Sequence, residues 1–110
     1  MKVAFDVKGT IEGYNKETVL RLFKGLQAKG HKCVVWSNLY TYAVNAIKDN
    51  GLTDTEPMDK MSKFDFRDRD MEPMDIAIED DRSQTWLGAK RIIFVDELDD
   101  AMVDSILQTA

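Results

Sequence analysis

Acidic and hydroxyl side chains follow three separate apolar segments of this 110-residue chain. Asp6 ends the first segment, Ser37 and Asn38 follow the second, and Asp80 and Asp81 follow the third. Carboxylate oxygens suit a hard divalent cation such as Mg²⁺, and a hydroxyl beside free backbone N–H groups suits a phosphoryl oxygen. An Asp or Ser after one strand is often only a turn former, but its repetition at three segment ends favours a shared site.

The segments that must position these residues show two alternating patterns. Short apolar runs predict buried strands, and apolar residues three or four positions apart predict helices. The predicted strands are 1–6, 31–36, 53–58, 74–78 and 90–95, and the predicted helices are 16–29, 39–50, 83–89 and 98–107. Segment 59–71 has poor apolar spacing and is predicted to be a loop or a short exposed helix.

This alternation predicts an α/β fold, a Rossmann-like three-layer sandwich around a parallel sheet of four or five strands. Ligands of such sheets bind beyond the carboxyl ends of the strands, and the acidic and hydroxyl side chains follow those ends. A chain of 110 residues fits one domain, residues 1–110, with its own core.

The charge balance narrows the classes of partner. The chain has 20 Asp and Glu against 15 Lys and Arg, a formal net charge of −5, which disfavours a nucleic-acid binder while leaving room for a small basic patch. The N-terminus lacks the apolar run of a signal peptide, and no run approaches the ~18 residues of a membrane span. We therefore expect a soluble, cytoplasmic protein with no membrane partner.

Three segments in combination resemble the motifs of the haloacid dehalogenase (HAD) superfamily. Residues 5–11 (FDVKGTI) resemble its first motif, normally Asp-x-Asp-Gly-Thr after an apolar strand. Residues 34–38 (VVWSN) resemble the second motif, and residues 75–81 (DIAIEDD) resemble the fourth. The motifs occur in the family's order and span nearly the whole chain. The intervals between them are too short for a cap domain, so the resemblance implies a capless member.

The resemblance implies a Mg²⁺-dependent phosphohydrolase in which Asp6 accepts the phosphoryl group as an aspartyl-phosphate. Asp6, Asp80 and the backbone carbonyl of Lys8 would hold Mg²⁺, with Asp81 as an additional or alternative ligand.

The resemblance also implies how the phosphoryl group would be held. The predicted phosphate-binding residues are Ser37, Asn38, Gly9 and Thr10. A lysine ahead of the third acidic segment would offset the charge between Asp6 and the phosphate, and both Lys60 and Lys63 are candidates. Lys60 leaves the more usual separation from Asp80.

Lys8 departs from the family pattern, because it stands where phosphatases of the family have a second Asp that acts as general acid and base. A positioned acid–base contributes typically about 10²–10⁴-fold in rate. A lysine ammonium can donate a proton but is a poor base at neutral pH. Lys8 could also pair with Asp6 and occupy the place of the metal.

Three outcomes follow from this departure. The chain is a slow phosphohydrolase, a degenerate member that binds phosphate or a protein, or an enzyme acting on carbon–halogen or carbon–phosphorus bonds. Without a cap, the site suits a phosphorylated macromolecule or a nucleotide that covers it, or a second subunit that does so in a homo-oligomer.

Overall fold

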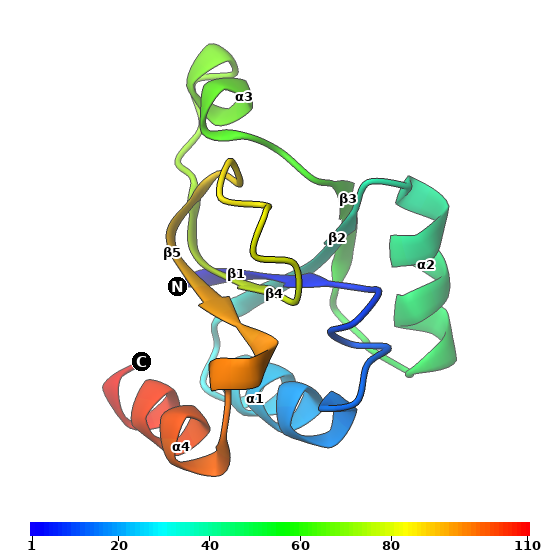
Figure 1. Ribbon diagram of the computed structural model, residues 1–110, viewed down its shortest axis with the longest axis vertical. Helices are drawn as coiled ribbons and strands as arrows, with labels where there is room; N and C mark the ends of the chain where they lie inside the picture. Colours follow the sequence, from blue (N-terminus) through cyan, green and yellow to red (C-terminus); the bar gives the residue numbers. More distant parts are fainter.

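The computed structural model describes residues 1–110 (Figure 1). The strands are β1 (Lys2–Asp6), β2 (Lys32–Ser37), β3 (Glu56–Asp59), β4 (Met74–Glu79) and β5 (Ala89–Phe94). The helices are α1 (Lys16–Ala28), α2 (Tyr40–Asp49), α3 (Lys63–Asp68) and α4 (Asp100–Thr109), with a 3₁₀ turn, η1, at Val95–Glu97. None of the helices has the length and apolar character that crossing a membrane requires.

The five strands form one parallel sheet in the order β3-β2-β1-β4-β5. The chain builds outward from β1 to β3 and then crosses back to β4 on the other side of β1. β1 is therefore the point where the strand order reverses, and ligands of parallel α/β sheets bind at such a point. The sheet confirms the predicted α/β fold and its strand number.

The two faces of the sheet are covered unequally (Figure 1). Helices α1, α2 and α4 cover one face, where alternate strand residues such as Phe5 join a core cluster of 20 buried side chains. The other face contributes Trp36 to a cluster of nine buried side chains, which Phe66 of α3 and Leu87 complete. A single short helix and the irregular segment 80–88 thus cover this second face.

Helix α3 forms in the segment for which a loop or short exposed helix was predicted. Its start is fixed by a capping box, in which the Ser62 hydroxyl accepts from the Asp65 N–H and the Asp65 carboxylate accepts from the Ser62 N–H. The helix is not wholly exposed, because Phe66 is buried in the second core cluster. A six-residue helix is too short to show the repeated apolar spacing that would predict this buried side chain.

The predicted helix over 83–89 is wrong. This segment is a series of turns that crosses from β4 to β5, and β5 begins at Ala89. The Asp81 carboxylate accepts hydrogen bonds from the backbone N–H and the hydroxyl of Ser83, which stabilises a turn rather than a helix. Gly88 packs so closely that a Cβ there would lie 2.3 Å from the Phe66 ring.

Candidate functional site

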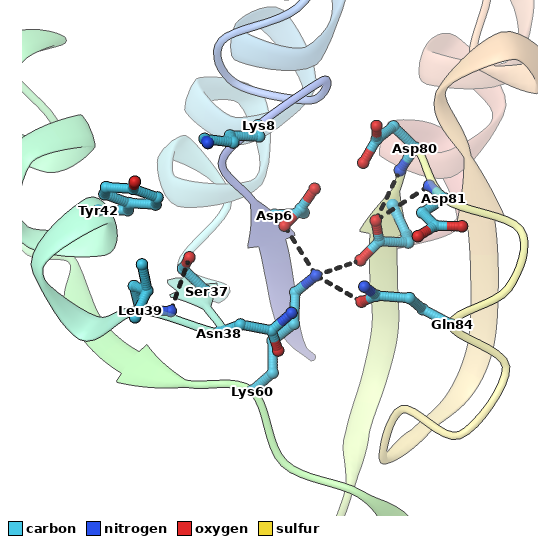
Figure 2. Close-up of a pocket in the computed structure, with 11 residues that line it drawn as sticks. Asp6, Lys8, Ser37, Asn38, Leu39, Tyr42, Lys60, Asp80, Asp81 and Gln84 are labelled. Atoms are coloured by element: carbon cyan, nitrogen blue, oxygen red, sulfur yellow. Dashed lines mark hydrogen bonds and ion pairs between the residues drawn. The ribbon is translucent and has the colours of Figure 1, made fainter.

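A cavity of about 320 Å³ lies at the carboxyl edge of the sheet, around the end of β1 (Figure 2). Eleven residues line it: Asp6, Lys8, Ser37, Asn38, Leu39, Tyr42, Lys60, Glu79, Asp80, Asp81 and Gln84. The predicted site residues at all three segment ends therefore meet in one cavity. Gly9, Thr10 and Lys63, which were also predicted site residues, do not line it.

Lys60 is the cation at the centre of the site. It directly follows β3, and its N–H donates to the Ser37 carbonyl at 3.0 Å, which continues the β2–β3 pairing by one residue. Its Nζ lies 2.9 Å from Asp6 Oδ1 and 2.8 Å from Glu79 Oε1, and it donates to Gln84 Oε1 at 2.6 Å. Only 4% of the side chain is exposed. Of the two lysines that the sequence left open, Lys60 is the one beside Asp6.

Lys63 is the first residue of α3 and lines a different hollow, on the side of α3, with Phe66 and Arg67. Its prediction as a site lysine is wrong, because the chain between β3 and α3 leads away from the carboxyl edge of the sheet. Three residues of separation were too few to distinguish the two lysines from sequence alone.

Glu79 is a site residue that the sequence did not single out. It ends β4 and is fully buried. Its Oε1 accepts from Lys60, and its Oε2 accepts from the backbone N–H groups of Asp80 and Asp81 at 3.0 and 3.1 Å. Both oxygens therefore already have partners, and Glu79 orients Lys60 and the turn after β4. The sequence did contain a signal for Glu79, because it is an acidic residue at the end of an apolar strand. A Glu that is buried in such a place requires a partner.

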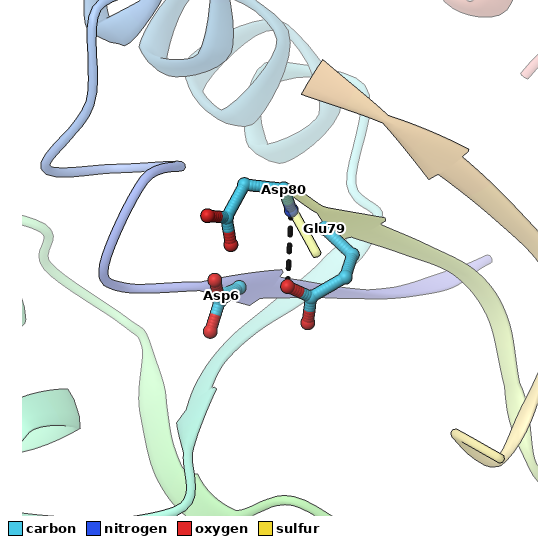
Figure 3. A group of neighbouring side chains, drawn as sticks. All are labelled: Asp6, Glu79 and Asp80. Atoms are coloured by element: carbon cyan, nitrogen blue, oxygen red, sulfur yellow. Dashed lines mark hydrogen bonds between the residues drawn. The ribbon is translucent and has the colours of Figure 1, made fainter. Parts of the chain in front are cut away.

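Three carboxyl groups converge in the cavity at a spacing that suits a metal ion (Figure 3). One oxygen each of Asp6, Glu79 and Asp80 lies within 4.8 Å of the others. All three donors are hard oxygens, as Mg²⁺ and Ca²⁺ prefer. Both oxygens of Glu79 have partners, and Lys60 and Thr10 contact the two oxygens of Asp6. The exposed Asp80 is therefore the carboxylate freest to turn toward a cation. The cluster could hold a metal ion.

Burial shapes the protonation of this cluster. It raises the pKa of Asp6 to about 8, with further contributions from the neighbouring carboxyl groups of Asp80 and Glu79, and Lys60 offsets this only in part. Burial likewise raises the pKa of Glu79. For Lys60, burial works against the charged form, but hydrogen bonds to Glu79 and Asp6 outweigh it and the pKa is raised. Without a metal, the cluster therefore retains a proton near neutral pH, and a divalent cation would displace that proton.

No family model, curated protein or solved structure matches this chain. The resemblance drawn from the motifs therefore stays a prediction, and the chemistry of the cavity has to follow from its own residues.

Gly9 and Thr10 shape the site without lining it. Gly9 adopts a φ of +76°, and a Cβ there would lie 2.0 Å from Asp80 Oδ2, so only glycine lets the loop after β1 approach Asp80. The Thr10 side chain is fully buried, and its hydroxyl donates to Asp6 Oδ2 at 3.3 Å. Both were predicted phosphate-binding residues, and Thr10 orients Asp6 instead.

Ser37 and Asn38 stand on the side of the cavity formed by the end of β2. The Ser37 Oγ accepts a hydrogen bond from the Leu39 N–H at 3.2 Å, which leaves its own O–H free to donate. Such a donor suits a phosphoryl oxygen. Asp81, predicted as a metal ligand, instead accepts two hydrogen bonds from Ser83 and is not part of the three-carboxyl cluster.

Lys8 does not pair with Asp6, so the alternative in which its ammonium occupies the place of the metal is not found. Its Nζ lies over the Tyr42 ring, 4.8 Å from the centroid (Figure 2). The side chain is exposed and lines the outer part of the cavity. No carboxyl group stands at this position to act as acid or base.

Proposed function

We propose that this chain is a Mg²⁺-dependent phosphohydrolase of the HAD type that forms an aspartyl-phosphate on Asp6. One observation carries the proposal: the Asp6 carboxylate stands at the switch point of the sheet, 2.9 Å from the Lys60 ammonium, and shares a cavity with Asp80 and Ser37. A nucleophile, a candidate cation site and a donor to phosphoryl oxygen thus converge in one cavity, as phosphoryl transfer requires.

The charges in the cavity support dependence on a divalent cation. Four carboxyl groups and two ammonium groups line it, so a phosphate dianion would be repelled without additional positive charge. Asp6, Asp80 and the backbone carbonyl of Lys8 would hold the ion. When bound, Mg²⁺ would supply the charge that offsets the phosphoryl oxygens and keeps Asp6 ionised.

The remaining residues would orient the reacting groups. Lys60 and Thr10 hold the two oxygens of Asp6 and so fix its carboxylate. The free O–H of Ser37 would donate to a phosphoryl oxygen, and Asn38 lines the same wall. No cap covers the cavity, which favours a substrate that encloses itself, such as a nucleotide or a phosphorylated macromolecule.

The test is hydrolysis of phosphomonoesters of increasing size, with and without Mg²⁺, together with fluorine NMR of the protein with Mg²⁺ and beryllofluoride. We expect Mg²⁺-dependent turnover and a bound beryllofluoride on the wild type, and we expect Asp6→Asn to abolish both. The matched control is Asp59→Asn, an exposed Asp that ends β3 at the same edge but outside the cavity. The absence of both turnover and adduct would rule out the enzyme.

A binding module for phosphate or a phosphorylated protein is the second candidate. Lys8 favours it, because an ammonium in place of the usual acid and base would slow turnover without preventing anion binding. Phosphate binding measured by calorimetry, undiminished when Mg²⁺ is removed and accompanied by no turnover, would support this candidate instead.

A further inference from the structure

The two ammonium groups that line the cavity differ in how they are used (Figure 2). Lys60 donates to Asp6, Glu79 and Gln84, so all three of its N–H donors have partners inside the protein. The Lys8 side chain forms no ion pair and no hydrogen bond, and only the Tyr42 ring lies against its ammonium. Lys8 is therefore the cation whose charge and donors are available to a ligand.

The backbone of Lys8 is fixed, although its side chain is free. The Gly9 N–H donates to the Glu12 carbonyl at 3.2 Å, and the Glu12 N–H donates to the Val7 carbonyl at 2.9 Å. These bonds close a tight loop on either side of Lys8. An exposed contact between an ammonium and an aromatic ring is weak, so an anion in the cavity can draw the ammonium away from Tyr42.

The cavity offers no free carboxyl or imidazole group that could act as a general acid on a leaving group. Three of its four carboxyl groups, those of Asp6, Glu79 and Asp80, form the candidate cation site. The fourth, Asp81, is engaged by Ser83, and no histidine lines the cavity. An alkoxide is a poor leaving group unless it is protonated, whereas a carboxylate or phosphate departs as a stable anion and needs only a nearby positive charge.

We propose that Lys8 is a specificity residue that selects substrates whose leaving group departs as an anion, namely acyl phosphates or phosphoric anhydrides. This inference rests on the proposed function. Asp6 attacks phosphorus, the bond from phosphorus to the bridging oxygen breaks, and that oxygen leaves with the electron pair and without a proton. The Lys8 ammonium stabilises the departing carboxylate or phosphate. Water then attacks the aspartyl-phosphate, its proton passes to the phosphate product, and the electron pair returns to the Asp6 carboxylate.

The experiment compares kcat/KM for acetyl phosphate, pyrophosphate and glycerol phosphate, each with Mg²⁺. For acetyl phosphate and for pyrophosphate, kcat/KM is divided by kcat/KM for glycerol phosphate. The intrinsic reactivity of the substrates cancels when this ratio is compared between wild type and Lys8→Met. We expect Lys8→Met to lower this ratio about 10- to 100-fold, the effect of one charged hydrogen bond, and Lys8→Arg to restore most of it. Acetyl phosphate and pyrophosphate, measured separately, decide between a carboxylate and a phosphate leaving group.

Two further variants test whether Lys8 determines the substrate preference. Lys8→Asp should reverse the preference by raising activity on glycerol phosphate, because it introduces a general acid. Lys63→Met, a lysine outside the cavity, should leave every ratio unchanged. Turnover with ratios that do not depend on Lys8 overturns this inference while the proposed function stands. Absence of turnover on all substrates, with no beryllofluoride adduct, overturns the proposed function and this inference with it.

Discussion

Lys60 is the one cation paired with the two buried carboxyl groups of the site, so its removal should be costly. Lys60→Met would leave Asp6 and Glu79 without their ion pair at sites where only 7% and 1% of the side chains are exposed. Breaking a buried pair by removing one partner costs about 3–5 kcal/mol. We expect a loss of that order in the free energy of unfolding, measured by urea denaturation at pH 7 without divalent cations.

The matched control for this variant is Lys32→Met. Lys32 also forms an ion pair, with Glu56 at 3.1 Å, but both side chains are more than half exposed. Surface pairs contribute about 0–1 kcal/mol, so this variant should lose less than about 1 kcal/mol. Equal losses in the two variants would contradict the central role of Lys60 in the site.

At this scale the sequence predicted residue types better than contacts. Asp6, Ser37 and Asp80 could be selected because each follows an apolar strand, and parallel strands bring such positions to one edge. The contacts of Thr10 and Glu79 could not be predicted from the sequence. Whether a buried polar side chain orients a neighbour or faces a ligand depends on the approach of loops that sequence spacing does not determine.

Among the elements, α3 is short, but it is the only helix that covers the second face of the sheet. Phe66 is 1% exposed and fills that core, whereas Phe64, two residues earlier, is 64% exposed. Phe66→Ala should cost about 3–5 kcal/mol, because it leaves a cavity beneath the helix. Phe64→Ala, the matched control, should stay within about 0.5 kcal/mol. Chemical denaturation of both variants is the measurement, and similar losses would contradict the orientation of α3.

The strands were predictable at this scale, and the crossover from β4 to β5 was not. Continuous apolar runs identify buried parallel strands because both faces of the sheet are covered. A short helix was predicted over 83–89, which carries the apolar residues Trp86 and Leu87, yet Trp86 is 44% exposed and Leu87 is buried. Bonds from Ser83 to Asp81 and the close packing of Gly88 on Phe66 decide the outcome, and these are tertiary effects.

For the whole molecule, the carboxyl cluster links stability to pH and to divalent cations. A carboxyl group whose pKa is higher in the folded chain than in the unfolded chain binds its proton more tightly when folded. Its contribution to stability is fully present below the unfolded value and is lost as pH rises to the folded value. For Asp6 that window runs from the ordinary 3.8 to about 8, and the raised pKa of Glu79 acts in the same direction. Asp65, Asp75, Asp81 and Asp96, whose pKa values are lowered, act in the opposite direction but only at more acidic pH.

Between pH 5 and pH 8 the metal-free protein should therefore lose stability, and Mg²⁺ should restore it more at pH 8, where fewer molecules have to release a proton to bind the ion than at pH 5. At a Mg²⁺ concentration one hundred times its Kd, the gain is about 2.7 kcal/mol, which corresponds to roughly 10 °C or more in Tm for a domain of this size. Thermal unfolding at both pH values, with and without Mg²⁺, measures the effect. In Asp6→Asn both the pH dependence and the Mg²⁺ gain should shrink, since the variant lacks the titrating ligand. A Mg²⁺ gain that is equal at the two pH values, or unchanged in Asp6→Asn, would mean that the ion binds elsewhere and not between the strand ends at the switch point.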